Sequence, residues 1–121
     1  AGPSAPRGGE AVIIGLIGGL IVYASILFFD RTLKIDDPVG AISAHGIVGI
    51  FGVMVVPFTN ADASLLTQLY GVVAIGGFGF LASYASVYLI NLVMPIRASD
   101  EEQSVGLDVS EIGVEAYPEF K

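Results

Sequence analysis

The sequence predicts an all-α, polytopic membrane protein with three transmembrane helices. Hydrophobic residues make up 54% of the 121-residue chain and charged residues only 14%, whereas soluble domains carry about 25% charged residues. Apart from one histidine, the uncharged residues gather in three long runs, 11–29, 39–58 and 64–96. Runs of this length are typical of helices that cross a bilayer. The 16 glycines fit this class, because close packing of membrane helices needs small residues.

The first run is preceded by a Pro- and Gly-rich segment, 1–10, which is predicted to be an extracytoplasmic loop rather than a signal peptide. Residues 11–29 are then predicted to form a transmembrane helix of roughly 28 Å. Gly15, Gly18 and Gly19 give it a Gly-xxx-Gly spacing, which predicts close contact with another helix. The alternative is that glycine is simply common in membrane helices.

The second run follows a short polar loop, 30–37, which is expected to be cytoplasmic. Asp37 is predicted to cap the next helix, with Pro38 in its first position. That transmembrane helix is predicted over 38–58, and Pro57 with the polar loop 59–63 ends it. Asp36 and Asp37 are interpreted as capping residues, because a metal site would need more carboxylates nearby.

The third run, 64–96, is predicted to be one long, tilted transmembrane helix. At 1.5 Å per residue it is roughly 50 Å long, well over the ~30 Å hydrocarbon core. It must therefore tilt, protrude or break, and the glycines at 76, 77 and 79 are the expected place for a bend. Tyr84, Tyr88 and Asn91 share one face, which suits either a membrane interface or packing against neighbouring helices.

The last segment, 97–121, is predicted to be an acidic cytoplasmic tail. It holds seven of the twelve acidic residues, all from position 100 onward, so nucleic acid is not an expected partner. Its apolar residues predict that it docks on another surface. The orientation rests on the basic residues: Arg31, Lys34, Arg97 and Lys121 fall on one side of a three-helix topology and Arg7 on the other. The positive-inside rule then places the C-terminus in the cytoplasm.

His45 is the only histidine of the chain and the one ionisable residue within the second run. An ionisable side chain in a membrane helix is costly, which marks a candidate functional site. On a helix of 100° per residue, small apolar residues share its stripe and are predicted to line a pore with it. These predicted pore-lining residues are Ala41, His45, Gly49, Gly52 and Val56.

Two interpretations of His45 remain open on the residues alone. A neutral imidazole can hydrogen-bond a small polar solute or relay a proton in a narrow lumen. It can equally bond a neighbouring helix and hold two helices together. A metal site is disfavoured, because the chain offers no cysteine and no second histidine. We expect no catalytic residues, no metal and no cofactor, and a protein that is not an enzyme.

Three segments together resemble the ammonium transporter family, Amt/Mep/Rh. The run IDDPVGAISAHGIVGIFG at 35–52 looks like the segment before and within the family's tenth membrane helix. The run AVIIGLIGG at 11–19 resembles the helix before it, and GLDVSEIGVEAY at 106–117 resembles the cytoplasmic C-terminal motif. The matches occur in the family's order and cover essentially the whole chain.

The resemblance implies a fold and a role. Family members are trimers of eleven-helix subunits, each with a hydrophobic pore, and this chain is similar to the last three helices and the tail. His45 matches the second of the family's paired pore histidines, past which ammonia crosses after ammonium is deprotonated. The implied partners are ammonium or ammonia, membrane lipid and a PII-type signal protein on the tail. The matching tail residues, implied to be regulatory, are Gly106, Leu107, Asp108, Glu111 and Glu115.

The chain also departs from the family pattern. The first histidine of the pair is absent, and Ile112 and Val114 stand in the tail where polar residues are usual. Three helices cannot enclose the family's pore. The sequence therefore predicts the C-terminal part of an ammonium transporter or channel in a cell membrane. The alternative is a reduced family remnant that acts as a structural or accessory subunit of a larger membrane complex.

Overall fold

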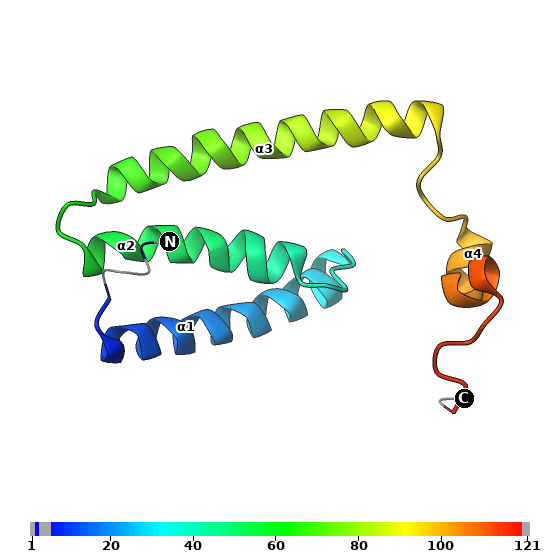
Figure 1. Ribbon diagram of the computed structural model, residues 1–121, viewed down its shortest axis with the longest axis horizontal. Helices are drawn as coiled ribbons and strands as arrows, with labels where there is room; N and C mark the ends of the chain where they lie inside the picture. The colour runs from blue at the N-terminus through cyan, green and yellow to red at the C-terminus, as the bar shows by residue number, and fades with distance from the viewer. Residues whose placement is uncertain (1, 3–5, 120–121) are drawn as a thin grey trace. The chain divides into compact units, whose positions relative to one another are not determined.

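The computed structural model of the chain describes residue 2 and residues 6–119, and the prediction of an all-α membrane protein is confirmed. Within these residues there are helices and no strands. Three helical stretches are long and apolar enough to cross a membrane, Gly8–Leu33, Ala41–Thr59 and Leu65–Val93. Lys121, which entered the prediction of orientation, lies outside the described residues. The helices of the chain are drawn in order in Figure 1.

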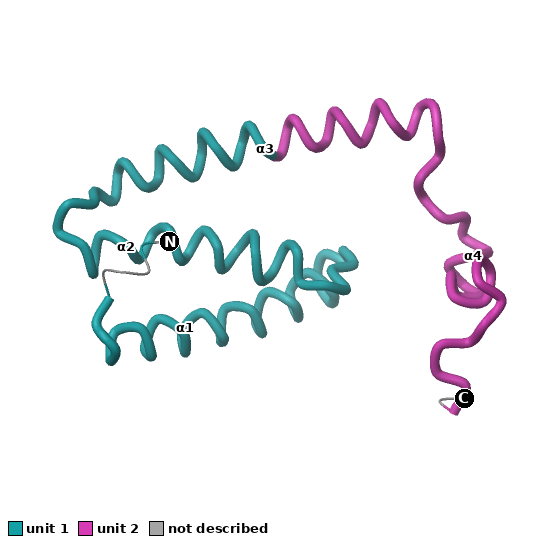
Figure 2. The backbone as a smooth tube through the Cα atoms, viewed as in Figure 1, with its two compact units in different colours: residues 1–79 teal, residues 80–121 magenta. Residues whose placement is uncertain are grey.

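The chain divides into two compact units, residues 1–79 and residues 80–121 (Figure 2). The boundary lies within the long helix α3 (Leu65–Val93). Unit 1 contains α1 (Gly8–Leu27), η1 (Phe28–Leu33), η2 (Ala41–Ile47), α2 (Val48–Thr59) and the first part of α3. Unit 2 contains the rest of α3, α4 (Asp100–Val105) and η3 (Asp108–Ile112).

The first membrane helix is longer than the uncharged run that predicts it. It begins where the Glu10 carboxylate accepts a hydrogen bond from the Arg7 backbone N–H at 2.7 Å. It then continues from α1 through the π-helical segment η1 to Leu33. Asp30 and Arg31 mark the edge of the apolar run, but neither breaks a helix. The helix ends at Lys34, which adopts the left-handed conformation with φ 54°, and the Ile35 N–H bonds back to the Phe29 carbonyl at 2.9 Å.

The second membrane helix begins later than predicted. A turn precedes it, closed by a 3.1 Å hydrogen bond from the Gly40 N–H to the Asp37 carbonyl. Pro38 lies in this turn, where its fixed φ is favoured, and not in the first helical position. Gly40 is the residue before the helix and has a positive φ of 69°, a conformation that glycine adopts without steric cost. The helix then runs as η2 with π winding and continues as α2.

In unit 1 the second membrane helix packs against the first. Gly18 is buried, and a Cβ built on it would lie 3.5 Å from Val48 Cγ1. Gly15 and Gly19 have no such neighbour within 4 Å. The close helix contact predicted from the glycines is therefore made by Gly18, and the Gly15–Gly19 pair does not take part in it within the described residues.

Helix α3 is one continuous α-helix of 29 residues. It starts one residue after the predicted run and ends three residues before its end, at Val93. The Asn91 side-chain oxygen accepts a hydrogen bond from the Ile96 N–H at 3.0 Å and so caps the chain where it leaves the helix. A span of this length was expected to tilt, protrude or break, and a break into two helices does not occur.

Candidate functional site

Asp37 anchors the start of the helix that carries His45. Its two carboxylate oxygens accept hydrogen bonds from the Ile42 N–H at 3.1 Å and the Ser43 N–H at 2.8 Å. These N–H groups belong to the first turn of the helix and have no partner within it. The Asp37 side chain therefore caps the helix, although the turn that contains Pro38 lies between Asp37 and the first helical residue. The hydrogen bond from the Ser43 backbone is the main cause that lowers the pKa of Asp37 below its ordinary value. The predicted capping role of Asp37 is confirmed, although the N–H groups that it caps lie five and six residues further along the chain.

Replacing Asp37 with alanine is expected to lower the melting temperature of the chain in detergent by about 4 °C at neutral pH. Because the folded-state pKa is lowered, the cap stabilises the fold above the ordinary pKa of an aspartate, about 3.9. The stabilisation is lost as the pH falls through the lower, folded-state pKa. Melting curves from neutral to acidic pH measure this. Asp36→Ala is the matched control, and a wild-type advantage that persists undiminished at the acidic end would contradict the capping role.

His45 lies in the π-helical segment η2, and its backbone N–H donates a hydrogen bond to the Gly40 carbonyl at 3.4 Å. The side chain is exposed in unit 1. An open groove of about 580 Å³ borders it, between the η2–α2 helix and the first part of α3. The lining residues are His45, Gly46, Gly49, Ile50 and Val53 from one helix and Gln68, Gly71, Val72, Ile75 and Gly76 from the other.

The groove takes up only part of the predicted stripe. His45 and Gly49 line it. The groove residues of this helix are nevertheless centred on a direction that is rotated about the helix axis by roughly 70° from the centre of the stripe. Ala41 is exposed and Gly52 is half-buried. Val56 is 7% exposed and lies against Gly2, whose Cβ would be 3.3 Å from a Val56 methyl group. The structure therefore places two of the five stripe residues in this groove, and the pore-lining role of the stripe stays a prediction.

Gln68 is the polar groove residue that the sequence reasoning missed. It is half-buried and shares one face of α3 with Gly71, Val72, Ile75 and Gly76, a spacing of i, i+3, i+4, i+7 and i+8 that marks a helix face. That spacing was the available signal. Gln68 lies roughly 5 Å along α3 from its start, whereas His45 lies roughly 21 Å from the end of α2. The two polar groups therefore stand toward opposite ends of an otherwise apolar groove.

The described part of the chain brings no three His, Cys, Asp or Glu side chains together in a way that could hold a metal ion. His45 has only glycine, apolar residues and the Gln68 amide in its groove. What the groove can offer chemically is hydrogen bonding to a small polar molecule from imidazole and amide groups, between walls that form no hydrogen bonds.

The predicted regulatory residues lie in unit 2, in a tail that contains two short helices, α4 and η3. Ser99 and Glu102 form a capping box that starts α4, with the Ser99 N–H donating to the Glu102 carboxylate at 2.7 Å. The Asp108 carboxylate accepts hydrogen bonds from the Ala116 N–H at 2.7 Å and the Val109 N–H at 3.0 Å. The Ala116 hydrogen bond is the main cause that lowers the pKa of Asp108.

Asp108 thus ties the segment after η3 back to its start. Leu107, which precedes η3, is exposed, as are Glu111 and Glu115. Gly113 ends η3 in the left-handed conformation, φ 74°, and the Val114 N–H reaches the Asp108 carbonyl at 3.3 Å. Of the five predicted tail residues, Gly106 and Asp108 therefore hold the local fold, whereas the other three offer their side chains to the surroundings.

Gly106→Ala is expected to loosen this tail. Gly106 has a φ of 102° and its Cβ would stand 2.7 Å from the Asp108 carboxylate, so alanine strains the backbone and displaces the residue that bonds Ala116. Strain of this kind costs roughly 1–3 kcal/mol, which predicts faster hydrogen exchange at the Ala116 amide by about fivefold or more. Gly113→Asn is the control, because asparagine tolerates the left-handed conformation. Equal exchange in wild type and Gly106→Ala would contradict the account.

Comparison with known proteins shows the family to which this chain belongs. The profile of the Ammonium Transporter Family matches residues 4–117, which includes both the His45 segment and the tail motif. The chain belongs to the ammonium transporter family. The match confirms the resemblance of the three segments, and it extends over the loops between them.

Curated members of the ammonium transporter family are similar over most of this chain. Ammonium transporter Amt1 of Haloferax mediterranei is 34% identical over 115 residues, which cover 90% of this chain and 22% of that protein. The ammonium transporter of Bacillus subtilis is 30% identical over 122 residues, covering 88% of this chain and 30% of that protein. Amt1 of Archaeoglobus fulgidus is 31% identical over 120 residues, with coverages of 88% and 30%.

The chain therefore spans between about a fifth and a third of these ammonium transporters. No solved structure matches it significantly. The relatives are transporters rather than enzymes by name, and together with the three apolar helices they establish a multi-pass membrane protein.

Proposed function

We propose that this chain forms the C-terminal part of an ammonium or ammonia transporter or channel and contributes His45 to its pore. The observation that carries the proposal is the setting of His45. It is an exposed imidazole among glycine and aliphatic residues, on a membrane helix, in the segment that matches the ammonium transporter family. Such a wall offers a solute one side chain that can form a hydrogen bond. It excludes ions, because moving an unpaired cation from water into an apolar medium costs much free energy.

The mechanism follows from that cost. Ammonium gives its proton to water at the mouth of the passage, and neutral ammonia crosses between apolar walls while the imidazole donates or accepts a hydrogen bond. On the far side ammonia takes up a proton from water again. Ala41 and His45 are both exposed in unit 1, and Gly49 is exposed beside them. Further polypeptide is proposed to complete the lumen on this side, in a homotrimer as the family resemblance implies.

The test is ammonia flux into liposomes that contain the full transporter carrying this chain, followed by the internal pH after an ammonium gradient is imposed. Flux above that of protein-free liposomes supports the proposal. Flux equal to that of protein-free liposomes would favour the alternative, an accessory subunit of a larger membrane complex.

For the tail we propose regulation from the cytoplasmic side, with a PII-type signal protein as the partner. Support comes from its local order: α4 is capped by Ser99 and Glu102, and Asp108 closes the following segment. Exposed Leu107, Glu111 and Glu115 then have fixed positions in which a partner could contact them. Deleting residues 104–121 from the full transporter tests this, and unchanged flux with unchanged response to a PII-type protein would refute it.

A further inference from the structure

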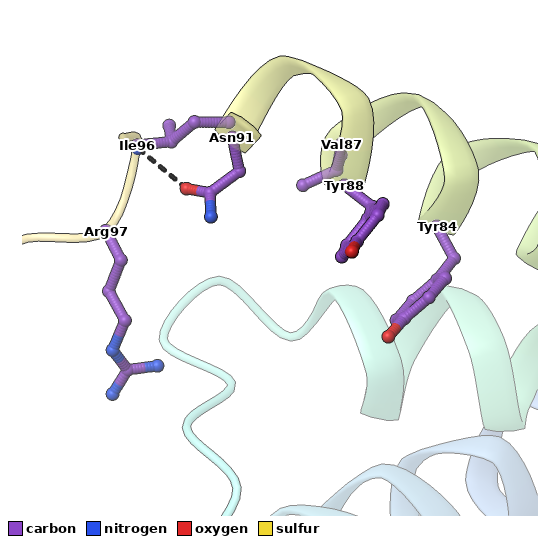
Figure 3. A pocket seen from close by; sticks show the side chains of 6 residues that line it. All are labelled: Tyr84, Val87, Tyr88, Asn91, Ile96 and Arg97. Carbon is purple, nitrogen blue, oxygen red and sulfur yellow. Dashed lines mark hydrogen bonds between the residues drawn. The ribbon is translucent and has the colours of Figure 1, made fainter. Parts of the chain in front are cut away.

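One buried side chain of the His45 helix has no hydrogen-bond partner. Ser43 is 0% exposed, and in the described part of the chain its hydroxyl is the one fully enclosed side-chain polar atom without a hydrogen bond. By contrast, the Asn91 side chain at the end of α3 accepts a hydrogen bond from the Ile96 N–H (Figure 3). A buried hydroxyl without a partner costs free energy, and this one lies two residues before His45.

Other hydroxyls in the helices show what Ser43 would ordinarily do. The Ser86 hydroxyl donates to the carbonyl four residues back at 2.8 Å. The hydroxyls of Thr59 and Ser104 donate to carbonyls three residues back, at 3.2 Å and 2.8 Å. A helical serine thus bonds a carbonyl three or four residues before it. For Ser43 the acceptor three residues back is the Gly40 carbonyl.

The Gly40 carbonyl is not available to Ser43, because two backbone groups already use it. The Ala44 N–H donates to it at 2.8 Å from four residues ahead, as in an α-helix. The His45 N–H donates to it at 3.4 Å from five residues ahead, as in a π-helix. A carbonyl oxygen has only two lone pairs. Val39, four residues before Ser43, precedes the positive φ of Gly40, where the chain leaves the helical path.

Asp37 is the other acceptor near this hydroxyl, and it is occupied as well. Its carboxylate accepts the Ser43 N–H at 2.8 Å and the Ile42 N–H at 3.1 Å. The hydrogen bond from the Ser43 backbone is the main cause that lowers the pKa of Asp37, and the nearby hydroxyl adds to this effect. The hydroxyl nevertheless does not reach hydrogen-bonding geometry with the carboxylate. The cap therefore holds the start of η2 without satisfying the hydroxyl.

Ordinary α winding of η2 would satisfy both donors. The His45 N–H would then donate to the Ala41 carbonyl, four residues back, and the Gly40 carbonyl would keep a lone pair for the Ser43 hydroxyl. The present His45 hydrogen bond, at 3.4 Å, is long for an N–H···O bond, so little is lost when it is exchanged. Against this stands the packing of η2 on α1 in its present winding.

We propose that Ser43 is a positioning residue for His45, because its hydroxyl competes with the His45 N–H for the Gly40 carbonyl. This competition sets the balance between a major π-wound state of η2, as in the structure, and a minor α-wound state. The change of winding turns the imidazole about the helix axis relative to the Asp37 cap. Its effect on a passing solute rests on the proposed function, whereas the balance itself does not depend on transport.

The test is NMR of the full chain in detergent micelles with isotopically labelled histidine. Because the chain has one histidine, the label gives one backbone amide signal, that of His45. Relaxation dispersion of this amide measures exchange between two states on the microsecond-to-millisecond timescale, and wild type is expected to show it. Ser43→Ala removes the competing hydroxyl and is expected to lower the population of the minor state about fivefold.

Two further variants make the result specific. Ser43→Cys keeps the size of the side chain but donates only weakly, so it should lower the population similarly, and it decides the matter if Ser43→Ala does not fold. Ser25→Ala is the matched control, because Ser25 is a buried serine of α1 outside η2, and it should leave the exchange unchanged.

Three outcomes would overturn the proposal. They are an absence of exchange in wild type, exchange that persists undiminished in both Ser43 variants, and an equal reduction in Ser25→Ala, which would indicate general loosening of the helix contact. Because the exchange is measured without transport, a failure of this proposal can be distinguished from a failure of the proposed function.

Discussion

Replacing His45 with alanine is expected to lower ammonia flux by about tenfold in liposomes that contain the full transporter carrying this chain. The imidazole is the one group of the predicted stripe that can hydrogen-bond a solute. A hydrogen bond in such a setting is worth about 1.4 kcal/mol at the upper end of the usual range, which corresponds to a factor of ten. Flux is followed by the internal pH after rapid mixing with an ammonium salt.

Two further measurements make the His45 experiment specific. Val53→Ala removes a groove side chain of comparable position that forms no hydrogen bond, and it should keep flux within about twofold. His45→Ala should also admit more cations, because an imidazole no longer narrows the passage. If flux and cation selectivity both stay at the wild-type level, the imidazole does not line the pathway and serves instead to hold helices together.

The second large effect is expected for Gly18→Leu, which should separate the first two membrane helices. The Cβ alone would already be in contact with Val48 Cγ1 at 3.5 Å, and Gly18 is buried, so a full leucine side chain must displace Val48 or the facing helix. Overpacking of this kind costs about 1–3 kcal/mol. Equilibrium unfolding of the chain in mixed micelles measures the loss of stability directly.

The controls for Gly18 are its own alanine variant and its neighbour. Gly18→Ala adds only the Cβ at an ordinary contact distance and should be tolerated, since alanine is also the better helix former. Gly19→Leu introduces the same side chain where no atom lies within 4 Å of the Cβ, and it should cost little. A loss at Gly19 as large as that at Gly18 would show that the helices pack through a different face.

The fold class and the position of His45 could be predicted from the sequence because both depend on local pattern. Long uncharged runs predict membrane helices whatever packs around them. The end of the first helix could not be located in the same way. Asp30 and Arg31 mark the end of the uncharged run, whereas the helix ends at Lys34, where the backbone turns left-handed.

The partners of the site residues depend on packing and were harder to predict. Gln68 became a groove residue only because one face of α3 borders the His45 helix. The hydrogen bond from the Ala116 N–H to the Asp108 carboxylate joins residues eight positions apart in the tail. No periodic pattern in the sequence predicts this hydrogen bond. Asp37 was recognisable as a cap, but its reach past Pro38 to Ile42 and Ser43 was not.

The π winding of η2 has a consequence for the length of this segment. A π turn holds more residues than an α turn, so the seven residues from Ala41 to Ile47 accommodate what amounts to an inserted residue. Deleting one residue there would let the backbone revert to ordinary helical winding with its hydrogen bonds intact. The histidine would nevertheless turn by roughly 100° relative to the Asp37 cap. Selection on the direction of one imidazole would therefore preserve the length of this segment more strictly than its sequence.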